Sequence, residues 1–179
     1  MDEIADIKRR SGIDEAGAGP SRIVQHIKAG RPFFTIAAER EYRDDKANKE
    51  ANRQLKSALS KSPVGYIKQS GEWEGVAESS YIVFPNNNLD DHQLSRFRDL
   101  GQALMQKFDQ LAIVFGDGEK IVMINNDGSV DDWGLDSVSF SPDKMKSAGG
   151  HSTIKGQNYV FAPSDSEDRN SVKLAASAD

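Results

Sequence analysis

Hydrophobic residues recur along the central part of the chain in patterns that predict one strand and one helix. Residues 33–38 are apolar on both faces of an extended chain, which predicts a central strand that is buried on both sides. The next apolar residues recur at spacings of three and four, which predicts an amphipathic helix that ends before Pro63. They are Ala47, Ala51, Leu55, Ala58 and Leu59.

Two hairpins are predicted further along. Residues 64–74 and 78–84 are rich in strand-forming side chains and are separated by a turn at Gly75. Residues 111–115 and 120–125 have the same character, and the glycine-containing segment between them favours a tight turn.

A second helix is predicted between the hairpins. Asp90 is a suitable N-cap, and Gln93 three residues later completes a capping box. Its apolar face consists of Leu94, Phe97, Leu100, Gly101, Leu104 and Phe108. The order β-α-β-β-α-β-β predicts an α+β fold, namely a ferredoxin-like split βαβ sheet with an extra edge strand and both helices on one face. A different mixed sheet with the same element order also fits the pattern.

The N-terminal residues 1–30 are predicted to form a helical appendage with a linker. Ile4 and Ile7 share one face of a short helix, and a second short helix begins at Pro20 after a stretch of small residues. One interpretation is a helix that lies across the core. The other is a docking segment at residues 1–13, in which Ile4, Ile7 and Ile13 contact a protein partner.

The core domain is predicted to span residues 31–127. Residues 128–162 have scattered hydrophobic side chains, which predicts an irregular extension that packs on the core and includes a strand near 158–162. Residues 163–179 are dominated by Ser, Asp, Glu and Ala, which predicts a disordered tail.

Composition excludes several classes of site. None of the 179 residues is a cysteine, so disulfides, a thiolate nucleophile and a cysteine zinc site are excluded. The net charge of −5 argues against attraction of the whole protein to nucleic acid or to an anionic membrane. The apolar runs are too short for a membrane span, and no apolar signal segment follows Met1, so a cytoplasmic protein is expected. No phosphate-loop or dinucleotide motif occurs, and no cofactor is expected.

Three glutamates of the first hairpin are candidates for chemistry. Glu72 and Glu74 alternate onto one strand face, and the turn would bring Glu78 back beside them. Clustered carboxylates suit a divalent ion or a general base. The alternative is a solvated hairpin tip, and no second ligand motif supports a metal site.

Two sets of polar residues on the first helix are candidates for binding. Four basic residues share one face, which suits phosphate groups but is also common on a solvated helix. They are Lys46, Lys49, Arg53 and Lys56. Asn48 and Asn52 lie one turn apart beside the apolar face, where they either line a pocket or form structural hydrogen bonds.

Several short motifs resemble those of a domain-of-unknown-function family of small bacterial and tailed-phage proteins. The motifs are Phe33-Phe-Thr-Ile-Ala-Ala-Glu-Arg40, Asn48…Asn52-Arg53, Gly65-Tyr66…Gly71-x-Trp73-x-Gly75 and Gln110-Leu-Ala-Ile-Val114. The resemblance covers about residues 31–125. It implies the outline of the fold but no catalytic mechanism. It implies signature polar positions at Asn48, Asn52, Arg53, Gly71, Glu78 and Ser79. Ala77 stands where family members have a second glutamate, which weakens a two-carboxylate mechanism. Residues 1–13 also resemble leader segments of phage proteins.

The sequence leaves three functions open. The leading hypothesis is a non-enzymatic accessory or interaction protein, encoded by a phage and associated with the virion, that reaches phage structural proteins through its N-terminal segment. The first alternative is a small enzyme that acts on a phosphate-containing substrate, a nucleotide or a nucleic acid. Its site would join the hairpin glutamates to three residues of the first helix, Asn48, Asn52 and Arg53. The second is a nucleic-acid-binding module that uses the basic helix face.

Overall fold

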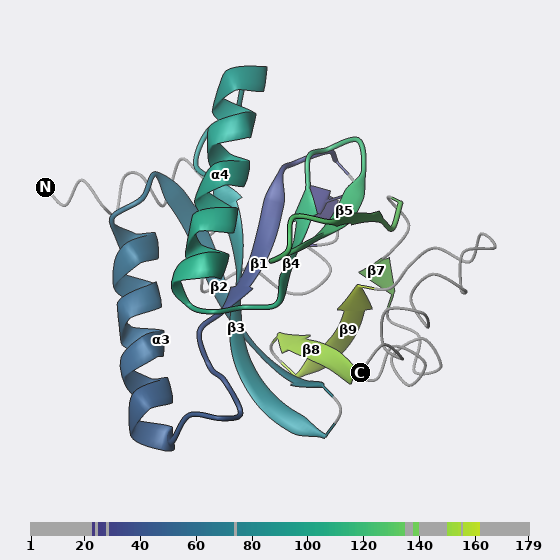
Figure 1. The fold of residues 1–179 in the computed structure, drawn as a ribbon. Coiled ribbons are helices and arrows are strands. Elements are labelled where there is room, and N and C mark those ends of the chain that lie inside the picture. The colour runs from purple at the N-terminus through teal and green to yellow at the C-terminus, as the bar shows by residue number, and fades with distance from the viewer. Residues whose placement is uncertain are drawn as a thin grey trace, which may run out of the picture.

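The computed structural model describes residues 23, 25–27, 29–73, 75–134, 138–139, 150–154 and 156–161 (Figure 1). Two long helices, α3 (Asp45–Ser60) and α4 (Asp91–Lys107), lie in this part of the chain. The strands are β1 (Phe33–Ala37), β2 (Val64–Trp73), β3 (Val76–Pro85), β4 (Ala112–Gly116), β5 (Ile121–Asn125), β6 (Val130–Asp132), β7 (Val138–Ser139), β8 (Gly150–Ile154) and β9 (Gln157–Phe161).

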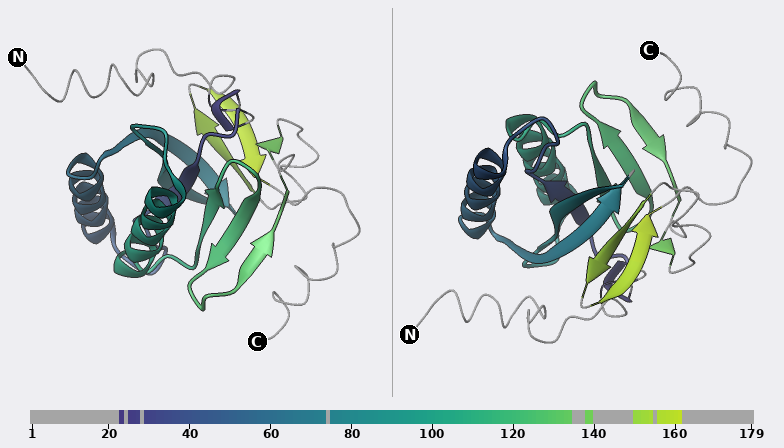
Figure 2. Two further views of the ribbon diagram at one scale, coloured as in Figure 1. Left: turned by 90° about the horizontal axis from the view of Figure 1, so that it is seen from above. Right: turned by 90° about the horizontal axis from the view of Figure 1, so that it is seen from below.

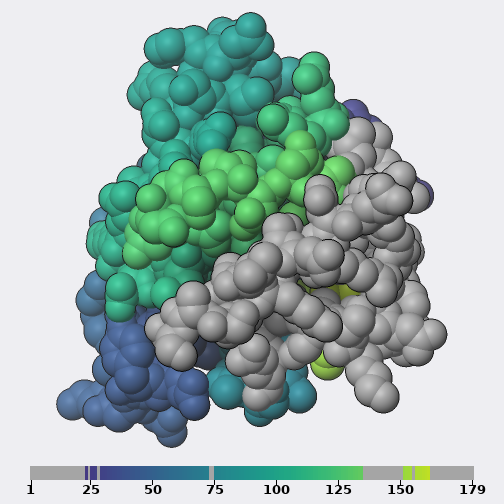
Figure 3. Space-filling view, turned by 45° about the vertical axis from the view of Figure 1, so that its right-hand side comes forward, coloured from purple at the N-terminus to yellow at the C-terminus, as the bar shows by residue number. Residues whose placement is uncertain are grey.

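The strands form one sheet in the order β6-β5-β4-β1-β3-β2-β8-β9-β7. Every pair of neighbours for which a register is defined is antiparallel. The sheet curls, so that its two sides bend away from the helices and toward each other (Figure 2). Figure 3 shows the outside of the β5–β6 side as a green band between α4 above and α3 below.

The predicted ferredoxin-like fold is therefore wrong. The elements between residues 33 and 125 occur in the predicted order, but the sheet continues on both sides and closes into a half-barrel. The extension predicted as irregular supplies β6, β7, β8 and β9, and β9 coincides with the strand expected near 158–162. Its short strands carry no sustained alternation, so their pairing with distant strands was not readable from local pattern.

Both long helices pack on the convex face of the sheet. Leu55 and Leu59 of α3 and Leu104 of α4 are buried in one apolar cluster with side chains of β1, β3 and β4. Burial of each such side chain stabilises the fold by about 1.5–3 kcal/mol. Helix α4 begins where the sequence predicts, because Asp90 and Gln93 form a complete capping box. Asp44 caps α3.

The concave face has its own apolar cluster. Phe33 points to this side while Phe34 points to the helix side, which explains why β1 is apolar on both faces. Ile23 and Ile27, from the predicted second N-terminal helix, are buried in the concave cluster together with Tyr159 of β9. This outcome matches a segment that lies across the core. Polar side chains remain in the middle of the same concave face, and they define the candidate site.

Candidate binding cavity

A cavity of about 250 Å³ lies on the concave face of the half-barrel. Its lining comes from β1, β2, β3, β4, β5, β8 and β9 and from the segments after α4 and after β6. The polar residues among the lining are Thr35, Gln69, Glu78, Ser80, Gln110, Trp133 and Ser152. Gln69 lies directly opposite Ser80 in the β2–β3 register, and Gly71 lies opposite Glu78, so these positions share one face. The cavity is therefore built from residues far apart in the chain.

A chain of hydrogen bonds joins two polar residues of the lining, Gln69 and Ser80, to the buried Tyr159 behind them. Gln69 is 3% exposed, and its Nε2 donates a hydrogen bond of 2.8 Å to Ser80 Oγ. The Tyr159 hydroxyl donates to Gln69 Oε1. Burial raises the pKa of Tyr159, so the hydroxyl keeps its proton at neutral pH. The amide of Gln69 is thereby fixed in one orientation.

Glu78 is the charged residue of the lining, and Arg40 lies beside it. Arg40 Nη1 is 3.9 Å from Glu78 Oε1, and the side chains are 12% and 28% exposed respectively. Burial raises the pKa of Glu78, an effect that Arg40 opposes and Glu39 reinforces. Burial also lowers the pKa of Arg40, although a guanidinium remains charged at neutral pH.

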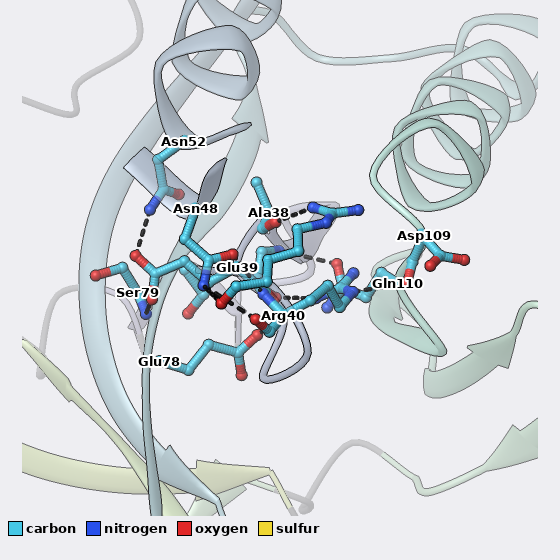
Figure 4. A network of polar contacts seen from close by, with 12 residues as sticks. Ala38, Glu39, Arg40, Asn48, Asn52, Glu78, Ser79, Asp109 and Gln110 are labelled. Atoms are coloured by element: carbon cyan, nitrogen blue, oxygen red, sulfur yellow. Dashed lines mark hydrogen bonds and ion pairs between the residues drawn. The ribbon is translucent and has the colours of Figure 1, made fainter. Parts of the chain in front are cut away.

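The guanidinium of Arg40 also donates hydrogen bonds to two backbone carbonyl groups. Its Nε donates to the carbonyl oxygen of Asp109 over 2.6 Å, and its Nη1 donates to the carbonyl oxygen of Glu39. Its Nη2 is buried and has no partner among the described residues. Arg40 is therefore held between the end of β1 and the end of α4 (Figure 4).

A second set of hydrogen bonds, from side chains of α3 and the backbone of β3, fixes Glu39 and Arg40 (Figure 4). Asn52 Nδ2 and the backbone N–H of Ser79 each donate to a carboxylate oxygen of Glu39, the latter over 3.1 Å. Asn48 bonds both backbone polar groups of Arg40. Both asparagines of α3 thus take structural hydrogen bonds, and neither lines the cavity.

Gln110 and Trp133 complete the polar lining in different ways. Gln110 Oε1 accepts a hydrogen bond of 2.8 Å from the backbone N–H of Ala37. The indole Nε1 of Trp133 is buried and has no hydrogen-bond partner among the described residues. Trp133 therefore brings to the cavity lining an indole donor that the described residues leave without an acceptor.

The structure separates the glutamates of the first hairpin. Glu72 pairs with Ala77 and Glu78 pairs with Gly71, so Glu72 and Glu78 lie on opposite faces. Glu72 is exposed, and Glu74 lies outside the described residues. Over the described part of the chain, no group of three histidine or acidic side chains is arranged to hold a metal ion.

The basic face of α3 lies away from the cavity. Lys46, Lys49, Arg53 and Lys56 are all exposed. Arg53 forms two hydrogen bonds with Glu50, of 2.7 and 2.8 Å, and holds the pKa of Glu50 at about 2. The structure does not bring Arg53 together with Glu78.

A wider hollow of about 740 Å³ lies near Arg31 and residues 86–88. Its charged groups are already bonded to the backbone: Arg31 Nη2 donates to the Pro85 carbonyl over 3.3 Å, and Asp117 Oδ1 accepts from two backbone N–H groups. The smaller cavity, with its unpartnered donor and its half-buried carboxylate, is the better candidate.

The sequence analysis missed most of the cavity. Gln69 follows Ile67 by two positions along β2, so the two side chains lie on the same face. This spacing from an apolar residue could have indicated that Gln69 is buried. Ser152 and Trp133 come from the segment in which no pattern was sustained. Their convergence depends on strand pairing.

A scan against protein-family models found no match, and a search of curated proteins found none either. The family resemblance and the phage origin therefore stay predictions. Among the residues that the structure describes, no helix is both long and apolar enough to cross a membrane. Ile4, Ile7 and Ile13 lie outside the described residues, so the docking hypothesis also stays a prediction.

Proposed function

We propose that this protein is a non-enzymatic binding protein that holds a small polar molecule in the cavity of its half-barrel. The observation that carries the proposal is the Tyr159–Gln69–Ser80 chain of hydrogen bonds, in which Gln69 and Ser80 line a cavity of about 250 Å³. Ligand sites typically combine apolar lining with a few fixed polar groups. Such a role is compatible with the accessory protein expected from the sequence.

The residues that the alternative enzyme would need do not lie together in the structure. That enzyme required several hairpin carboxylates near Arg53, but Glu72 lies on the opposite face from Glu78 and Arg53 pairs with Glu50 on the outside of α3. Glu78 is the acidic side chain among the described lining residues, so the carboxylate cluster of that alternative is not supported.

Thermal unfolding of the full chain against a panel of amines, amino acids, nucleobases and sugars tests the proposal. A ligand that binds the folded state raises the midpoint, and the increase grows with ligand concentration. We expect the increase to disappear in Gln69→Leu and to persist in Glu72→Gln, which changes the outer face of the same hairpin. Mass spectrometry should recover the ligand unchanged. A consumed ligand would indicate an enzyme, and an increase that survives in Gln69→Leu would place the site elsewhere.

A further inference from the structure

Two groups at the cavity wall have hydrogen-bonding capacity that the described residues do not use. Trp133 Nε1 is a buried donor with no acceptor. An indole N–H can only donate, and a buried donor without a partner destabilises the folded state. Buried polar groups in folded proteins are nearly always paired, so this donor is a position at which a ligand acceptor would be favourable.

Glu78 is the second such group. Its partner Arg40 is 3.9 Å away, at the outer limit of an ion pair, and Arg40 is bonded to the carbonyl oxygens of Glu39 and Asp109. A carboxylate accepts about four hydrogen bonds, so most of this capacity is available to a ligand. Burial raises the pKa of Glu78, which means that its charge lacks solvation that a cation would supply.

The charge near Glu78 favours a cation over an anion. The neighbouring Glu39 is also a carboxylate, and it reinforces the rise in the pKa of Glu78. An anionic ligand would face Glu78 directly, whereas an ammonium group would replace lost water with a charge-assisted hydrogen bond. The other polar lining residues, such as Gln69 and Ser80, are neutral.

We infer that the ligand is a small amine that also carries a hydrogen-bond acceptor, with its ammonium group at Glu78 and its acceptor at the indole N–H of Trp133. This inference rests on the proposed binding function. The cavity of about 250 Å³ is below the ~300–1,000 Å³ typical of sites for drug-sized ligands, so the amine is the size of an amino acid derivative.

Indole N–H signals in nitrogen-15 NMR spectra of the full chain test the inference, because the chain has two tryptophans. Trp133→Phe assigns the signals. The probe is glycinamide, which has both an ammonium group and a carbonyl. Acetamide lacks the cation, and methylammonium lacks the acceptor. We expect glycinamide to shift the Trp133 signal saturably and to bind more tightly than either control.

Substitutions at the two ends of the site complete the test. Glu78→Gln should weaken glycinamide binding about 10- to 100-fold, the range for a hydrogen bond to a charged group, and Glu72→Gln should leave it unchanged. Equal binding of acetamide and glycinamide, or unchanged affinity in Glu78→Gln, would overturn the inference. If the backbone signals of Gln69 and Ser152 still shifted, the proposed binding function would stand without it. If no probe shifted any cavity signal, the inference would fall, and the broader panel would decide the proposed function.

Discussion

Asn48 forms hydrogen bonds with both backbone polar groups of Arg40. Its Oδ1 accepts from the Arg40 N–H over 2.9 Å, and its Nδ2 donates to the Arg40 carbonyl over 3.0 Å. The same Nδ2 is 3.3 Å from the carbonyl oxygen of Arg43. One side chain of α3 thereby fixes the segment after β1, and this segment carries the arginine that lies beside Glu78.

Asn48→Ala should destabilise the protein by about 1–3 kcal/mol, because it leaves partly buried backbone groups of Arg40 without partners. Urea unfolding measures the free energy. The control is Lys49→Ala, at an exposed neighbouring position, which should change it by less than about 0.5 kcal/mol. Equal effects of the two substitutions would show that the Asn48 bonds do not stabilise this segment.

Glu78→Gln should stabilise the protein at neutral pH. Burial raises the pKa of Glu78 in the folded state, so folding favours its protonated form and stability decreases as pH rises through that pKa. Arg40 opposes this effect and Glu39 increases it. Glutamine removes the penalty, and we expect the thermal midpoint to rise by about 2–4 °C for each kcal/mol recovered.

The gain in Glu78→Gln should disappear at acid pH, where the carboxyl of the natural residue is protonated. Thermal unfolding of both proteins across the pH range checks this dependence. A gain of the same size at every pH would point to a packing effect instead of the charge.

Gly71→Ala should destabilise the protein by about 1–3 kcal/mol through overpacking. A Cβ at this position would lie 2.7 Å from the backbone oxygen of His151, so β2 and β8 would have to separate locally. Ser70→Ala, at an exposed position on the other face of β2, is the control and should be nearly neutral. Thermal unfolding distinguishes the two, and a neutral Gly71→Ala would show that the β2–β8 contact is adaptable.

The basic face of α3 should not bind nucleic acid strongly. The net charge is −5 and Arg53 is paired with Glu50, so we expect filter binding of DNA or RNA to be weak and to change little with salt. Combined Lys49→Glu and Arg53→Glu should then leave binding unchanged. Binding that falls steeply with salt, and is lost in the double variant, would instead support the nucleic-acid module.

Deletion of residues 1–13 should abolish association with a protein partner and leave the thermal midpoint nearly unchanged. The prediction follows from the short apolar face of Ile4 and Ile7 ahead of a small-residue linker. Pull-down with the full chain, read by mass spectrometry, measures the association. The full-length variant Ile4→Asp with Ile7→Asp is a matched control and should behave like the deletion. A partner retained by both would remove the docking role.

The sequence by itself determined the local elements. Spacings of three and four specified both long helices, and Asp90 with Gln93 specified the start of α4, because capping and amphipathic faces depend on residues within a few positions of each other. The apolar run of β1 predicted burial on both faces, which the convex and concave clusters confirm.

The tertiary structure decided what those elements bring together. A shift of one residue in the strand register would move Glu78 to the other face of the sheet. The observed pairing with Gly71 places Glu78 on the concave side, away from Glu72. The pairing of β2 with β8 and of β8 with β9 curls the sheet and places Ser152 and Tyr159 on the face that holds Gln69. These contacts join residues up to 90 positions apart, and their free energy depends on packing that no local pattern of hydrophobic residues records.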